Sequence, residues 1–128
     1  MVWKYEPDED PKKKHKWSKP VPGFVKVNGV TIGKCPSKMT NEEAEELLNQ
    51  GIPWDPPRAP IASWPQTIYI VHDGCVYRAK PTNPGISYHA FPELPEKLRE
   101  LPRTLRHKIE QKAEELGCGD KVRRWINR

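Results

Sequence analysis

Side chains suited to RNA cleavage are gathered between residues 69 and 89 of the sequence. Cleavage without a metal ion needs a base to deprotonate the 2′-hydroxyl, cations to hold the phosphate and an acid to protonate the leaving oxygen. The candidate set that offers these groups is Tyr69, Arg78, Lys80, Thr82, Tyr88 and His89. We therefore predict a catalytic site within this segment.

Four members of the set have a predicted catalytic role. His89 is the predicted base or acid, because imidazole titrates at about pH 6.5. Arg78 can hold a phosphate through two parallel hydrogen bonds, while Tyr88 or Tyr69 would donate a proton or stack on a base. Adjacent strand residues such as Tyr88 and His89 point to opposite faces, so both serve one site only if the strand is broken there. The structural alternative is that Tyr69 stacks on Arg78 and that His89 is held by ordinary hydrogen bonds.

Other familiar catalytic and metal-binding motifs are missing from the sequence. There is no glycine-rich phosphate loop, no His-Glu-x-x-His, no Gly-x-Ser-x-Gly and no Cys-x-x-Cys pair. His72 and Cys75 would be neighbours across a hairpin, close enough to share a zinc ion, but we interpret Cys75 as a buried thiol beside a polar sheet edge. A nucleophilic Cys35 or Cys75 acting with His89 lacks a local signature. We expect no metal site and no cofactor.

The distribution of charge indicates an anionic partner. The formal net charge is +5, and residues 96–128 carry ten Lys/Arg against six acids. We expect Arg123, Arg124 and Arg128 to lie on the outer side of a short helix and to bind phosphate together with Lys80. The predicted partner is nucleic acid, with RNA favoured, although a merely solvated surface would have the same composition.

Length and composition predict a single domain. A chain of 128 residues can bury a core without metals or crosslinks. Residues 1–20 are predicted to form a charged, partly mobile N-terminal arm, and residues 21–128 a single α+β domain. No stretch approaches the roughly 20 apolar residues that span a bilayer, and three widely spaced cysteines are typical of a reducing compartment. We expect a cytoplasmic protein without a membrane partner.

Two β-hairpins are predicted from their turn residues. Asn28-Gly29 and Asp73-Gly74 each offer two positions that accept positive φ, the requirement of a type I′ turn. The first hairpin covers residues 24–32 and the second residues 67–79. In the second, Tyr69 lies opposite Arg78. A third strand at 86–91 would carry His89.

Helices are predicted from capping residues and prolines. Thr40 and Glu43 form a capping box, and the helix that begins there should stop at Gly51. The prolines of residues 53–65 exclude regular helix and central strand. Further helices are expected near 95–101, near 103–116 and after Asp120. The predicted fold is α+β, with two hairpins forming a small antiparallel sheet, packed by a central capped helix and C-terminal helices.

Two functional hypotheses follow from these patterns. The first is a small basic domain that binds RNA or another nucleic acid and acts as a metal-independent ribonuclease of bacterial toxin type. The stretch from Ile68 to Phe91 resembles small bacterial toxin domains in its general character. The second is a non-catalytic protein-interaction module, an inhibitor or accessory subunit that uses the tryptophan-rich and proline-rich surface. An acidic protein is a further predicted partner, as the antidote to a toxin. A continuous basic groove ending at His89 would favour the first hypothesis, and an exposed apolar patch the second.

Overall fold

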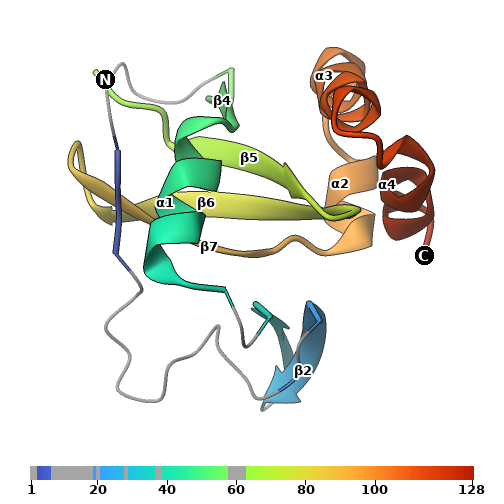
Figure 1. Cartoon of the computed structure of the whole chain (residues 1–128), viewed down its shortest axis with the longest axis horizontal. Coiled ribbons are helices and arrows are strands. Elements are labelled where there is room, and N and C mark those ends of the chain that lie inside the picture. The colour runs from blue at the N-terminus through green and yellow to red at the C-terminus, as the bar shows by residue number, and fades with distance from the viewer. Residues whose placement is uncertain (1–2, 7–18, 20, 28, 37–38, 58–62) are drawn as a thin grey trace.

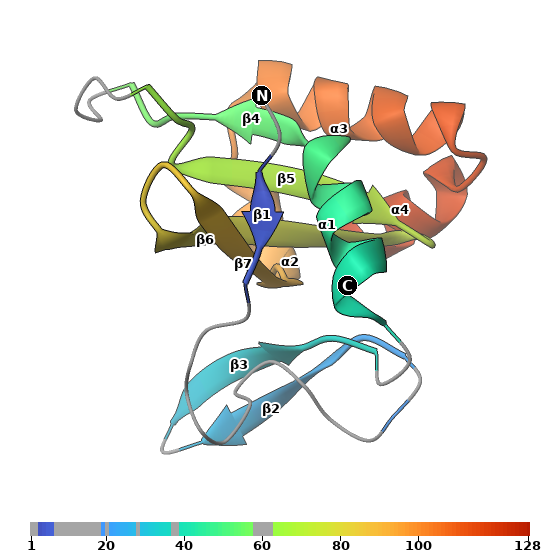
Figure 2. The same ribbon diagram turned by 60° about the vertical axis from the view of Figure 1, so that its left-hand side comes forward.

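The computed structural model describes residues 3–6, 19, 21–27, 29–36, 39–57 and 63–128. These residues form the helices and strands that are drawn in Figures 1 and 2. In chain order they are β1 (Lys4–Tyr5), β2 (Gly23–Val27), β3 (Val30–Lys34), α1 (Asn41–Asn49), β4 (Ile52–Trp54), β5 (Thr67–His72), β6 (Cys75–Asn83), β7 (Ser87–Pro92), α2 (Pro95–Arg99), α3 (Arg103–Glu115) and α4 (Gly119–Ile126). The predicted α+β class is confirmed.

Both predicted hairpins are present. β2 pairs with β3, and β5 pairs with β6, in antiparallel register. In the second turn Asp73 has φ 49° and Gly74 has φ 82°, the two positive values that a type I′ turn requires. In the first turn Gly29 has φ 80°, while Asn28 lies outside the described residues. The turn residues in the sequence therefore predicted the positions of both hairpins correctly.

The two hairpins belong to different sheets, whereas the sequence suggested one. The main sheet has the order β1-β7-β6-β5-β4, and β2 and β3 form a separate two-stranded sheet. The reason is that β4 occupies the free edge of β5 and β7 occupies that of β6, so both edges of the second hairpin are filled. Figures 1 and 2 show β2 and β3 beyond β7. There the two sheets come close, since a Cβ on Gly33 would lie 2.4 Å from the Pro92 carbonyl oxygen.

The capped helix begins where predicted. Thr40 accepts a hydrogen bond from the backbone N–H of Glu43 at 3.1 Å, and α1 follows. The helix ends before Gly51, but this glycine does not have the positive φ that the sequence suggested. It is instead a point of close packing, because a Cβ there would lie 2.5 Å from Cγ2 of Ile68 on β5.

The C-terminal helices begin and end close to the residues that the sequence indicated. Pro95 begins α2, and Pro102 directly precedes α3. Gly117, with φ 76°, takes the left-handed conformation after α3. α4 begins at Gly119, one residue before the predicted Asp120.

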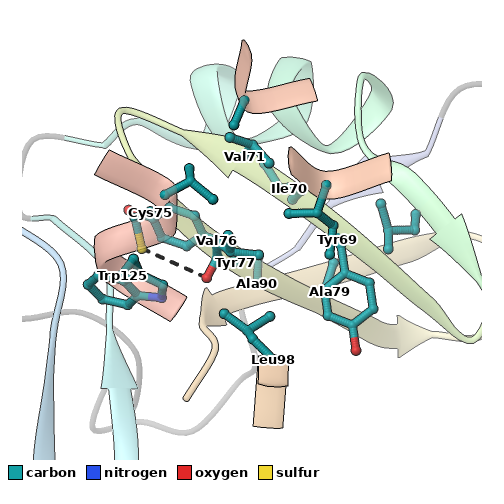
Figure 3. Packing of buried hydrophobic residues seen from close by; sticks show 14 of the residues in the cluster. Tyr69, Ile70, Val71, Cys75, Val76, Tyr77, Ala79, Ala90, Leu98 and Trp125 are labelled. Atoms are coloured by element: carbon teal, nitrogen blue, oxygen red, sulfur yellow. Dashed lines mark hydrogen bonds between the residues drawn. The ribbon is translucent and has the colours of Figure 1, made fainter. Parts of the chain in front are cut away.

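Helices cover both faces of the main sheet. Figure 2 shows α1 in front of the sheet and α3 and α4 behind it. Consequently both faces of the central hairpin are apolar and buried, with Ile68 and Ile70 on one face and Tyr69 and Val71 on the other. Figure 3 shows this packing around β5 and β6. No helix in the described part of the chain has the length and apolar character needed to cross a membrane.

Candidate nucleic-acid interface

The register of β5, β6 and β7 brings most of the predicted set onto one face of the main sheet. Tyr69 lies opposite Arg78, and Arg78 lies opposite Phe91. Lys80 pairs with His89 in the next row. Because side chains alternate along a strand, these residues share a face. The buried end of this face is covered by the C-terminal helices, whereas five residues at the other end remain partly or fully exposed. We call these five the β6–β7 surface: Arg78, Lys80, Thr82, His89 and Phe91.

His89 is held in a defined orientation by Thr82. The Thr82 hydroxyl donates to the carbonyl oxygen of Glu6 at 2.7 Å and lies 2.8 Å from Nδ1 of His89. A hydroxyl has a single proton, so the second contact is a bond that Nδ1–H of His89 donates to Thr82. In neutral His89 the basic nitrogen is then Nε2.

Phe91 lies close to two of the three basic side chains of this surface, His89 and Lys80. The ring centroids of His89 and Phe91 are 6.2 Å apart with an interplanar angle of 34°. The Lys80 ammonium lies 6.0 Å from the Phe91 centroid, at the outer limit of a cation–π contact. Phe91 and His89 are half-buried and Lys80 is exposed. The result is an aromatic ring flanked by an imidazole and a cation on an accessible part of the sheet.

Arg78 is tied to a buried carboxylate. Its Nη1 lies 3.5 Å from Oε2 of Glu93, whose side chain is only 4% exposed compared with 26% for Arg78. The other oxygen of Glu93 accepts the backbone N–H of Leu94 at 2.9 Å. Nε of Arg78 is buried and has no hydrogen-bond partner in the described part of the chain. The buried Glu93 carboxylate thus holds one side of the Arg78 guanidinium, while another part of the guanidinium faces solvent.

The two tyrosines of the predicted catalytic set are buried. Tyr69 is 2% exposed, and burial raises its pKa to about 12, an effect that the charge of Arg78 partly opposes. Tyr88 is fully buried on the opposite face of the sheet, where its hydroxyl donates to the Pro65 carbonyl oxygen at 2.5 Å. Burial also raises the pKa of Tyr88 to about 12. The strand is unbroken at Tyr88 and His89, so the structure does not bring these two side chains together.

The C-terminal arginines have different surroundings. Arg123 is paired with Glu114 at 2.8 Å and with Asp120, and these bonds raise its pKa. The guanidinium of Arg128 lies 4.3 Å from the ring centroid of Trp125. Arg124 is exposed, and it has no ion-pair partner in the described part of the chain. Of the three, Arg124 is therefore the most available to a phosphate.

The residues weighed as metal ligands do not gather into a site. His72 and Cys75 are cross-strand partners as predicted, but burial strongly raises the pKa of the Cys75 thiol, and a thiol must lose its proton to bind zinc. Across the described ranges, no three His, Cys, Asp or Glu side chains lie together as a metal-ligand group.

Two residues of the site were missed at the sequence level. Phe91 and Glu93 follow His89 at intervals of two, so strand alternation predicts that both share its face. The ladder does continue past β7, since the N–H of Glu93 donates to the Val76 carbonyl oxygen at 2.9 Å. Extending the alternation by two positions would have identified both.

Comparisons of this chain with protein-family models, with curated proteins and with solved structures found no match.

Proposed function

We propose that this chain binds single-stranded RNA through the β6–β7 surface. The observation that carries the proposal is the half-buried Phe91 ring flanked by His89 and Lys80 on the accessible part of the sheet. Proteins that bind single-stranded nucleic acid combine aromatic side chains, on which bases stack, with cations that follow the backbone. The surface offers both kinds of group within two adjacent rows of the sheet.

Each group on the surface has a place in this proposal. A base would stack on Phe91, and Lys80 together with the solvent-facing part of Arg78 would contact the flanking phosphates. His89 would bond to the 2′-hydroxyl through Nε2, which distinguishes RNA from DNA. Arg124 on α4 and Arg128, which follows the end of that helix, would extend the contact with the phosphate backbone. The formal net charge of +5 favours the encounter with a polyanion.

The binding proposal is tested by removing the aromatic ring. Phe91→Ala should weaken the binding of a fluorescein-labelled single-stranded RNA by about 1 kcal/mol, roughly fivefold, because base stacking on an aromatic side chain contributes about 1–3 kcal/mol and this ring is half-buried. Fluorescence anisotropy gives the dissociation constant. Ile86→Ala is the matched control, since Ile86 is a large apolar side chain that is 55% exposed in the turn before β7.

The proposal also predicts strong salt dependence. Wild-type affinity should fall linearly with log salt concentration, and the loss of one phosphate contact should lower that slope by about 0.7 for a single strand. Binding that is insensitive to salt, or equal in Phe91→Ala and the wild type, would remove the RNA hypothesis and favour the protein-interaction module.

The two neighbouring arginines of α4 should differ in this assay. Arg124→Ala should lower the salt slope by about 0.7, whereas Arg123→Ala should lower it less, because Glu114 and Asp120 already pair with the Arg123 guanidinium. Anisotropy at several salt concentrations measures both slopes. Equal slopes for the two variants would mean that RNA displaces the ion pairs of Arg123, and no effect of either would place α4 outside the interface.

RNA cleavage is a second candidate function, favoured by the Thr82–His89 contact. Thr82 fixes Nδ1 of His89, which directs Nε2 to serve as the base for a 2′-hydroxyl. In that reaction Nε2 takes the hydroxyl proton and the 2′-oxygen attacks the adjacent phosphorus. The bond from phosphorus to the 5′-oxygen then breaks, and the leaving 5′-oxygen takes a proton from water, so the products are a 2′,3′-cyclic phosphate and a 5′-hydroxyl. Lys80 and Arg78 would hold the charge that develops on the phosphate.

A further inference from the structure

A cleft of about 400 Å³ lies at the edge of the main sheet, away from the β6–β7 surface. It is formed by the C-terminal end of α1, the last residues of β5 and the turn between α3 and α4. Its lining includes Gln50, Val71, His72, Lys112, Leu116 and Lys121. The cleft thus combines an apolar wall, two lysines and the edge of a strand.

The strand edge in this cleft is open at Val71. β4 pairs with β5 only as far as Ile52 opposite Tyr69, and among the described residues no strand pairs with β5 beside Val71. Across the hairpin, Val76 faces Val71, and the Val76 carbonyl accepts the N–H of Glu93 on the other side. In an antiparallel ladder, the polar groups of Val71 therefore point away from β6 and toward the cleft.

Pro53 confirms this alternation. It lies opposite Ile68, at the position of β4 where a backbone N–H would point out of the sheet. The N–H and C=O of Tyr69 are consequently used by Ile52, and those of Val71 come next along the same edge. An open edge of this kind is a template for an additional extended segment.

The charges around the cleft indicate which kind of extended segment would bind there. Lys112 of α3 is half-buried, and Lys121 of α4 has a side chain that is 61% exposed. One carboxylate also lines the cleft, that of Asp73, which lies 3.9 Å from the Lys121 ammonium and is 82% exposed. Leu116, 50% exposed, provides an apolar contact beside these charges.

From these observations we infer that the cleft binds an extended acidic peptide segment of a protein partner. The segment pairs its backbone with the N–H and C=O of Val71, packs an apolar side chain against Leu116 and places a carboxylate between Lys112 and Lys121. This interface is separate from the RNA-binding proposal, because it uses the outer edge of β5 rather than the exposed face of β6 and β7, and it takes a different class of partner.

The open edge has a consequence for the protein without a partner. In a hydrogen-exchange experiment followed by NMR, the Val71 amide should exchange at least about tenfold faster than those of Ile70 and His72, which donate to β6. Equal protection of the three amides would mean that the edge is already closed, and it would overturn the inference.

Binding is tested with a five-residue peptide of alternating valine and glutamate with blocked ends, titrated into ¹⁵N-labelled protein. The amides of Val71, His72 and Gly117 should shift, and the same peptide with lysine in place of glutamate should bind more weakly. The double variant Lys112→Ala, Lys121→Ala should weaken binding about fivefold. The control is Lys97→Ala, Lys108→Ala, which removes two exposed lysines outside the cleft. Shifts located elsewhere, or equal affinity for the two peptides, would overturn the proposed partner without affecting the RNA proposal.

Discussion

His89→Ala is expected to lower the rate of RNA cleavage by about 10²–10⁴-fold, the usual contribution of a general base. RNA binding should fall far less, because Phe91 and Lys80 remain. The rate of product formation from a labelled oligonucleotide gives the first quantity, and anisotropy gives the second. His107→Ala is the matched control, since His107 is an exposed histidine of α3. Excess chelator should leave the rate unchanged, because the proposed base and cations are side chains.

Two further variants separate the roles of the neighbours of His89. Thr82→Val removes the hydroxyl that holds Nδ1, so it should lower the rate while leaving binding nearly unchanged. Tyr88→Phe removes a hydroxyl on the other face of the sheet, and the rate should be that of the wild type. A catalytic role for Tyr88 would require a loss of rate in that variant. Absence of cleavage by the wild type would leave RNA binding as the function of the surface.

Arg78→Met is expected to lower the free energy of unfolding by about 2–3 kcal/mol. The substitution leaves the Glu93 carboxylate buried without its cation, and breaking a fully buried ion pair costs about 3–5 kcal/mol. We expect a loss of about 2–3 kcal/mol rather than the full cost of a buried pair, because Arg78 is partly exposed and the 3.5 Å contact with Glu93 is long. Urea denaturation followed by circular dichroism measures the change.

The double variant Arg78→Met, Glu93→Gln identifies the cause of this loss. It removes the buried charge while the Gln oxygen can still accept the N–H of Leu94, so at least half of the lost stability should return. Arg103→Met controls for the loss of an exposed arginine. If Arg78→Met changed stability by less than about 0.5 kcal/mol, the pair would be an ordinary surface contact.

Local signals predicted much of the fold. The Asp73-Gly74 turn fixed the register of β5 and β6, and Thr40 fixed the start of α1, because each depends on residues that are neighbours in the sequence. β1 and β4 were missed. β1 has two residues and pairs with a strand far along the chain, and β4 contains Pro53, which is compatible only with an edge.

The candidate site was predictable to the extent that it depends on strand alternation. The Tyr69–Arg78 row follows from turn position and period alone. The Lys80–His89 row does not, because the pairing of β6 with β7 shifts by one residue between Pro81 and Asn83. The burial of Tyr69 does not, because it depends on which face of the sheet the C-terminal helices cover. The ion pair between Arg123 and Glu114 likewise depends on the angle between α3 and α4, whereas the pair with Asp120 lies within α4.

The short strand β1 also bears on the order of folding. The bond from the Ser87 hydroxyl to the Glu6 carboxylate joins residues 81 positions apart, whereas β5, β6 and β7 are joined by tight turns. Long loops carry the larger closure entropy, so the β5–β6–β7 meander is expected to form first and β1 to dock late. Contacts made after the transition state affect mainly the unfolding rate. Until β1 docks, the outer edge of β7 is available to another chain. Docking of β1 therefore protects the partly folded chain against edge-to-edge association.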